Sequence, residues 1–140
     1  LELKAGVVEL LDYLELEAIP RAVATSSGHG SVERQLRPLG LVERFGAIVA
    51  RSDYANGKPS PDPFLTAAAR LGVAPEACLA LEDSHNGVRA ATAAGMMTIM
   101  VPDLLAATQE MRQLCVAIAD TLHEVRDLLA AQRAATQARG

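Results

Sequence analysis

Residues 79–87 read Leu79-Ala80-Leu81-Glu82-Asp83-Ser84-His85-Asn86-Gly87, and this short run sets the architecture of the chain. An apolar segment ends in two adjacent carboxylates, and a glycine and an alanine-rich helical pattern follow. The succession predicts a strand over residues 78–81 and a helix over residues 86–94. Carboxylates just after a parallel strand lie at the edge of the sheet where ligands bind, and their oxygens can bind a hard cation such as Mg²⁺. Glu82 and Asp83 are therefore candidates for a metal site, although such acids also cap the helix that follows.

The same alternation of apolar runs and helical patterns continues along the chain. Four more strands are predicted over residues 19–25, 47–50, 97–101 and 116–119, and four more helices over residues 6–17, 31–39, 64–71 and 122–132. Short strands separated by helices are typical of βαβ units. We therefore expect an α/β fold, Rossmann-like, with three αβα layers around a parallel sheet. Residues 1–132 would form this domain, and residues 133–140 a disordered tail.

Composition excludes several classes of function. The 140 residues are 50% hydrophobic and carry a net charge of −4, as in a globular domain that buries a core. No basic stripe suggests nucleic acid, and no apolar run is long enough to suggest a membrane. Cys78 and Cys115 lie in apolar runs and are predicted to be buried, reduced thiols, which together with the missing signal-peptide pattern favours the cytoplasm.

A second candidate site follows the strand predicted over residues 19–25. Thr25, Ser26 and Ser27 place a hydroxyl and small residues before a helix, an arrangement that cradles phosphate with backbone N–H groups. The same residues also suit a simple capping turn. His29 is expected to be a solvated loop residue.

The polar loop over residues 52–63 holds the third candidate, Lys58. It stands between Gly57 and Pro59, and two further prolines follow. A stiff backbone places an ammonium group reproducibly, as a phosphate or carboxylate site requires, although a solvated lysine in a capped turn fits as well.

Three sequence blocks resemble motifs of the haloacid dehalogenase-like hydrolases, in particular the β-phosphoglucomutase and phosphoglycolate phosphatase branch. The blocks are residues 23–27, residues 57–64 and residues 81–87. The resemblance implies a Mg²⁺-dependent phosphatase or phosphomutase that acts on a small phosphorylated metabolite through an aspartyl-phosphate.

The resemblance also implies a role for each candidate residue. Thr25, with the backbone of Ser26 and Ser27, would bind the transferring phosphoryl group. Lys58 would neutralise the phosphate and the nucleophile. The metal ligands would be Asp83, which binds Mg²⁺ directly, and Glu82 beside it.

One departure from the family pattern is decisive for the expected activity. The first motif, Asp-x-Asp-x-Thr, supplies the nucleophile, yet no Asp-x-Asp occurs in the chain, and the helical cap of this branch is missing too. Residues 3–6 resemble the point at which the family's chain returns from the cap. We therefore expect an incomplete core that is inactive alone. The alternative is a non-catalytic module that binds phosphate or another protein.

The missing motif belongs to a strand that the family places between the strands before Thr25 and Glu82. Its loss would leave two interior strand edges with unpaired backbone groups. Either these strands close up and pair, a second chain or the missing N-terminal segment fills the gap, or the fold is only marginally stable.

Overall fold

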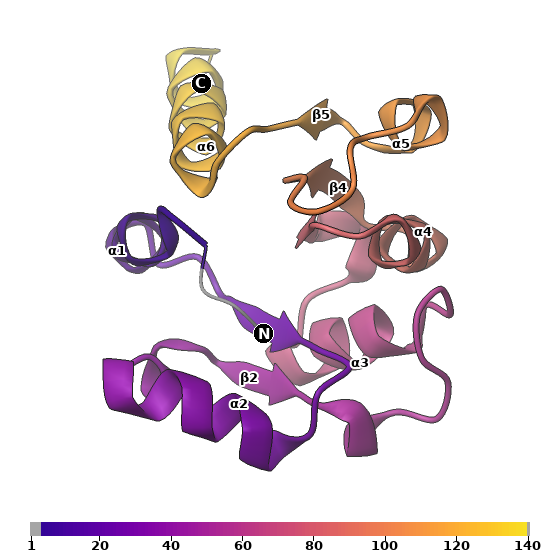
Figure 1. Cartoon of the computed structure of the whole chain (residues 1–140). Helices are drawn as coiled ribbons and strands as arrows, with labels where there is room; N and C mark the ends of the chain where they lie inside the picture. The colour runs from indigo at the N-terminus through magenta and orange to yellow at the C-terminus, as the bar shows by residue number, and fades with distance from the viewer. Residues whose placement is uncertain (1–3, 140) are drawn as a thin grey trace.

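The computed structural model describes residues 4–139 and contains two small parallel sheets (Figure 1). In the first sheet, β1 (Ala22–Ala24) pairs with β2 (Ala47–Val49). In the second sheet, β3 (Leu79–Glu82) pairs with β4 (Met97–Met100), and β4 pairs with β5 (Ala117–Ile118). All of these pairs are parallel, so the α/β class and the Rossmann-like arrangement are confirmed.

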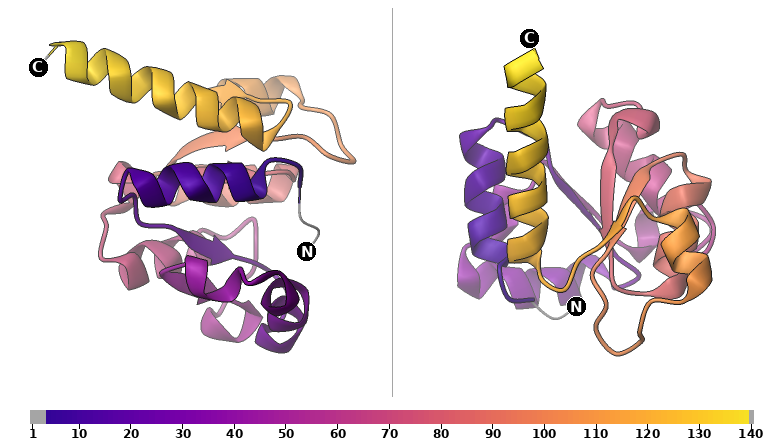
Figure 2. Two further views of the ribbon diagram at one scale, coloured as in Figure 1. Left: turned by 90° about the vertical axis from the view of Figure 1, so that its left-hand side faces the viewer. Right: turned by 90° about the horizontal axis from the view of Figure 1, so that it is seen from above.

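Helices connect the strands and cover both faces of the sheets (Figures 1 and 2). The α-helices are α1 (Val7–Leu16), α2 (His29–Leu36), α3 (Asp62–Leu71), α4 (His85–Ala93), α5 (Gln109–Leu114) and α6 (Leu122–Arg139). Short 3₁₀ turns are η1 (Arg37–Leu39), η2 (Val42–Arg44), η3 (Arg51–Asp53) and η4 (Pro75–Ala77). Helices α1, α2 and α6 supply the core on one face, and α3, α4 and α5 supply it on the other.

Alternation along β3 shows how the sequence builds these layers. Leu79 and Leu81 pack toward Leu10 of α1 and Val125 of α6. Ala80 points the other way and joins the cluster of α3 and α4. Successive side chains of a strand point to opposite faces, so a mostly apolar strand can bury both of its sides. The carboxylate of Glu82 then falls at the end of this buried strand.

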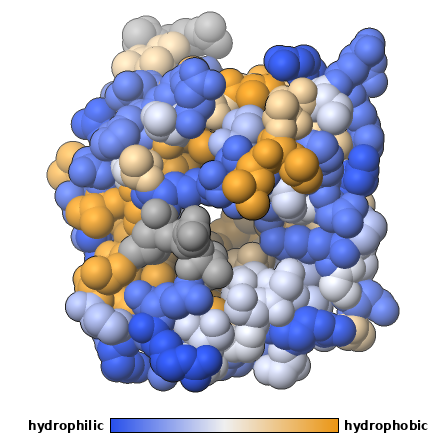
Figure 3. Space-filling view, viewed as in Figure 1, coloured by the Kyte–Doolittle hydropathy of each residue, from blue (hydrophilic) through white to orange (hydrophobic). Residues whose placement is uncertain are grey.

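A space separates the two sheets where the family pattern places another strand. Among the residues that the structure describes, β1 and β3 are not joined by strand pairing, so the first of the three alternatives, that these neighbours close up and pair, does not hold. Figure 3 shows the molecule hollowed between its two halves. Two connections hold the two sheets and their helices together. Leu10 and Leu11 of α1 enter different core clusters, one beside each sheet, and α3 contacts α4.

The phosphate-loop region differs from its prediction at two points. β1 is only three residues long rather than spanning residues 19–25, because its partner β2 offers three residues for pairing. α2 begins at His29 with Gly28 as its N-cap, two residues before the predicted start of this helix at residue 31. The helix therefore starts closer to the strand, and its free N–H groups lie nearer to the Thr25 loop.

The C-terminal helix is longer than predicted. The sequence placed its end near residue 132 with disorder beyond, whereas α6 continues to Arg139. Alanine, glutamine and arginine, which favour helix, make up most of this extension. An ion pair between Arg133 and Glu17 (3.2 Å) also attaches the last turns to the end of α1.

The cysteines are less buried than expected. Cys78 and Cys115 are free thiols of intermediate exposure, and the partial burial of each raises its pKa.

Between Lys4 and Arg139, no helix combines the length and the apolar character that crossing a bilayer would need.

Candidate functional site

The loop after β1 is fixed by hydrogen bonds at Thr25. The Thr25 N–H donates to the Val49 carbonyl (2.9 Å), which extends the β1–β2 pairing by one residue. The Thr25 Oγ1 accepts a hydrogen bond from the Ser27 N–H (3.1 Å), and the Tyr54 hydroxyl donates to the Thr25 carbonyl (2.9 Å). Thr25 is buried, Ser27 is partly exposed and Ser26 is exposed. The strand exit is thus rigid, and small side chains border it.

The 3₁₀ turn η3 braces this loop from the side of β2. The Arg51 N–H donates to the Ser27 carbonyl (2.9 Å), and the Asp53 carboxylate contacts His29 Nε2 (2.5 Å) and Arg70 (3.1 Å). The pKa of Asp53 is lowered to about 2, chiefly by the hydrogen bond from the Ala50 N–H and next by the hydrogen bond from Arg70. His29 is therefore the first residue of α2 rather than a loop residue, and its side chain, although 47% exposed, is paired with Asp53.

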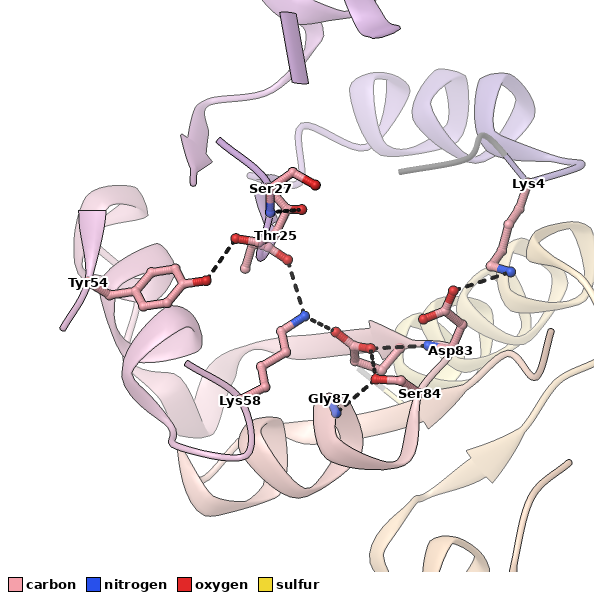
Figure 4. A network of polar contacts seen from close by, with 10 residues as sticks. Lys4, Thr25, Ser27, Tyr54, Lys58, Asp83, Ser84 and Gly87 are labelled. Carbon is pink, nitrogen blue, oxygen red and sulfur yellow. Dashed lines mark hydrogen bonds and ion pairs between the residues drawn. The ribbon is translucent and has the colours of Figure 1, made fainter. Parts of the chain in front are cut away.

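Lys58 links the ends of the two sheets. It lies in the loop before α3, and its Nζ donates to the Ala24 carbonyl (3.4 Å) and to Glu82 Oε1. The ammonium also stands over the Phe64 ring, 5.1 Å from its centroid. Its side chain is 14% exposed. Figure 4 shows the Lys58 side chain pointing from this loop toward the strand ends that carry Thr25 and Asp83. This lysine is not a solvated surface charge.

Glu82 is a buried acceptor at the end of β3. Besides Lys58, its carboxylate accepts hydrogen bonds from the Asp83 N–H (3.2 Å) and the Ser84 hydroxyl (3.3 Å). Ser84 is the N-cap of α4 and accepts from the Gly87 N–H (3.0 Å). The Glu82 carboxylate lies directly on Gly87, since a Cβ there would stand 2.0 Å from its Oε2. The carboxylate position therefore depends on glycine at residue 87.

Asp83 turns its carboxylate in a different direction. It is 47% exposed and faces Lys4, whose Nζ lies 3.5 Å away (Figure 4). The same ammonium lies 3.2 Å from Asp103, the third residue after the end of β4. The two adjacent acids of the motif are thus paired with two different lysines, which removes the repulsion that like charges would otherwise cause.

The acids fit a hard cation in part. Within the described residues, no group of three His, Cys, Asp or Glu side chains is assembled to hold a metal. Asp83 nevertheless offers partly exposed carboxylate oxygens that already face a cation, and oxygen is the ligand that Mg²⁺ prefers. Glu82 is committed to Lys58 and would serve as a second ligand only through a change of partner.

The structure brings the predicted site residues to one edge. Thr25, Ser26 and Ser27 follow β1, Glu82 and Asp83 follow β3, and Lys58 contacts both strand ends. The functional roles of these six residues stay predictions. These strand ends carry hydroxyl and N–H donors, a fixed ammonium and carboxylates.

Sequence reasoning missed three residues that shape this edge. Tyr54 gave no signal, and Lys4 was noted only within residues 3–6 and not for this site, because the contacts of both residues depend on the folded positions of distant segments. Asp103 could have been found, since it comes shortly after β4 as Asp83 comes after β3, and polar residues beyond parallel strands gather at one edge.

Comparison with known proteins agrees with this geometry. The family model of the haloacid dehalogenase-like hydrolases matches residues 1–101. The chain is 44% identical over 108 residues to a probable pseudouridine-5'-phosphatase of Drosophila melanogaster, a match that covers 73% of this chain and 47% of that protein. It is 39% identical over 126 residues to the beta-phosphoglucomutase of Bacillus subtilis, covering 88% and 55%. The chain thus spans about half the length of the curated relatives it matches.

Solved structures give the same result. A putative beta-phosphoglucomutase from Thermotoga maritima superposes with a TM-score of 0.82 at 32% identity, covering 91% of this chain and 59% of that one. CbbY from Rhodobacter sphaeroides in complex with phosphate superposes with a TM-score of 0.79 at 34% identity, covering 87% and 55%. On its sequence motifs, its family match and its fold, this chain belongs to the haloacid dehalogenase-like hydrolases, in their phosphoglucomutase and phosphatase-like branch.

Proposed function

We propose that this chain forms the phosphate-binding and metal-binding part of a Mg²⁺-dependent phosphatase or phosphomutase for a small phosphorylated metabolite. The observation that carries the proposal is the position of Lys58, which joins the phosphate loop after β1 to the carboxylates after β3. A solvated loop lysine would have no reason to bridge two strand ends. The relatives named above, a phosphatase and a phosphomutase, support the same chemistry.

Thr25 and Lys58 would hold the phosphoryl group. The Thr25 hydroxyl already accepts the Ser27 N–H, which leaves its proton available to an anion, and the backbone of Ser26 and Ser27 adds N–H donors. Lys58 supplies a fixed positive charge a short reach away. Charge placed in advance stabilises developing negative charge at little cost of reorganisation.

Asp83 would hold Mg²⁺, and Glu82 would join it as a second ligand only after a change of partner from Lys58. The metal would supply charge neutralisation at the phosphoryl oxygens. Asp83 would serve as the direct ligand because it is the more exposed of the two, whereas Glu82 would chiefly orient Lys58. Before the metal binds, the pairing of Glu82 with Lys58 would keep the ammonium at the site.

The nucleophile would come from a strand that occupies the space between β1 and β3. Among residues 4–139, both strands present an edge without strand pairing toward this space, and Lys58 contacts the ends of both strands. An aspartate at the carboxyl end of such a strand would face Lys58 and could form an aspartyl-phosphate, which divides the transfer into two steps. Without this strand we expect the chain to be inactive. Self-association through the same edges is the competing outcome.

Free cysteines support a cytoplasmic location.

The test is complementation of the chain by a strand. The purified chain is mixed with a synthetic peptide that carries an apolar run followed by Asp-x-Asp-x-Thr, and hydrolysis of p-nitrophenyl phosphate is followed with Mg²⁺ present. We expect no hydrolysis by the chain alone and measurable hydrolysis with the peptide. Size-exclusion chromatography of the chain alone reports whether two copies fill the space for each other.

Matched variants make the test specific. A peptide with Asn in place of the first Asp, Lys58→Met and Asp83→Asn should each abolish the complemented activity. Hydrolysis by the chain alone that is lost in Lys58→Ala or Asp83→Ala would contradict the need for a further strand. Absence of hydrolysis with every peptide would favour a non-catalytic binding module.

A further inference from the structure

Lys4 makes a contact that the proposed mechanism does not use. It precedes α1, and its ammonium lies between the carboxylates of Asp83 (3.5 Å) and Asp103 (3.2 Å). These acids follow β3 and β4, so one flexible side chain joins the start of α1 to both strand ends. Figure 4 shows the Lys4 side chain extending down to Asp83 from the segment before the helix.

The surroundings of Lys4 leave room for exchange with solvent ions. A cavity of about 240 Å³ lies beside it and is lined by Lys4, Asp103 and Asp120 among others. The Lys4 side chain is 26% exposed, and both of its acidic partners are nearly half exposed. Ion pairs as exposed as these are weak and are screened by salt.

We propose that the Lys4 ammonium is a built-in counter-ion of Asp83, which a divalent cation must displace in order to bind. The inference rests on the proposed metal role of Asp83. A cation that binds the Asp83 carboxylate directly is opposed by an ammonium on the same group, because the two positive charges repel each other. Metal binding and the Lys4 contact therefore compete.

The competition connects the metal site to the start of α1. The Lys4 carbonyl accepts a hydrogen bond from the Val7 N–H (3.3 Å), the first residue of the helix. Metal binding frees the Lys4 side chain and leaves Asp103 as its remaining partner. The segment through which the chain enters α1 thus responds to the occupancy of the site.

The experiment measures Mn²⁺ binding by the whole chain, using electron paramagnetic resonance to count free Mn²⁺. Replacing the ammonium by an isosteric apolar side chain in Lys4→Met should tighten Mn²⁺ binding about two- to fivefold, the range set by losing weak exposed ion pairs. Lys4→Arg keeps the competing charge and should bind as the wild type does. Arg34→Met removes an exposed cation from α2, on the other sheet, and controls for net charge.

Salt gives a second readout. At about 1 M salt, where the Debye length is about 3 Å, the affinity ratio between Lys4→Met and the wild type should shrink toward one. Equal or weaker Mn²⁺ binding by Lys4→Met, or equal tightening by Arg34→Met, would overturn the proposal.

Asp83→Asn separates this inference from the proposed function. It should abolish Mn²⁺ binding in both the wild-type and the Lys4→Met backgrounds. Binding that survives Asp83→Asn would refute the metal role of Asp83, and so would the absence of Mn²⁺ binding in every variant, and either result would remove the inference with it. Binding that requires Asp83 but ignores Lys4 would refute only the inference.

Discussion

Gly87→Ala tests the local structure on which the Lys58–Glu82 pair depends. An alanine Cβ would stand 2.0 Å from Oε2, 2.1 Å from Cδ and 2.6 Å from Oε1 of Glu82. The Glu82 side chain is only 8% exposed, so its carboxylate cannot move aside without losing its partners. Two opposing effects then decide the stability of the variant.

The loss of the carboxylate contacts should outweigh the gain in helix propensity. Replacing glycine by alanine inside a helix stabilises by about 1 kcal/mol. Overpacking costs about 1–3 kcal/mol, and leaving one member of a buried charge pair without its partner costs about 3–5 kcal/mol. Because Lys58 keeps some access to solvent, we expect the lower part of this range, a net loss of about 2 kcal/mol in the free energy of unfolding.

Urea denaturation of the 140-residue chain measures this loss. Gly57→Ala is the matched control, since no heavy atom lies within 4 Å of its added Cβ, and it should be neutral or slightly stabilising. In a Glu82→Ala background the obstructing carboxylate is absent, so Gly87→Ala should become neutral or stabilising. Equal destabilisation in both backgrounds, or a Gly87→Ala chain as stable as the wild type, would refute the reasoning.

Three further predictions concern the loops around the site. The pKa of Asp53 is lowered to about 2, so the stability that this residue contributes is complete above about pH 4 and is lost as the pH falls from 4 toward 2. Measuring the free energy of unfolding over this pH range should show the loss, and the Asp53→Asn variant should lack this pH dependence. Tyr54→Phe removes the donor to the buried Thr25 carbonyl and should cost about 1–2 kcal/mol by urea denaturation, and a loss below 0.5 kcal/mol would argue against this bond. Ser84→Ala removes the N-cap of α4 and should cost about 1 kcal/mol, similar to Thr108→Ala at the N-cap of α5; an unchanged midpoint for Ser84→Ala alone would show that the cap is dispensable.

The strand exits could be predicted from the sequence because local patterns determine them. An apolar run before Glu82 and a helical pattern after it fix β3 and α4 with little help from distant residues. The same holds for β4 and the end of α3 at Gly72, whose φ of 69° suits glycine. The positions of Thr25, Lys58 and Asp83 at one edge then follow from the rule for parallel sheets.

Contacts between segments far apart in the chain could not be predicted in this way. Lys4 lies 79 positions before Asp83 in the sequence, and no pattern in the residues between them predicts this ion pair. The extension of α6 depends in part on an ion pair with Glu17, at the other end of the chain. The separation of the sheets likewise depends on how α1 and α3 hold them, which no local pattern contains.

The central claim is that one edge of the molecule binds a phosphate and a divalent cation together. Isothermal titration of inorganic phosphate into the chain, with and without Mg²⁺, tests it most directly. The account predicts that Mg²⁺ tightens phosphate binding, that Asp83→Asn removes this coupling and that Lys58→Met abolishes phosphate binding. Phosphate binding that is indifferent to Mg²⁺ and unchanged in Lys58→Met would contradict it.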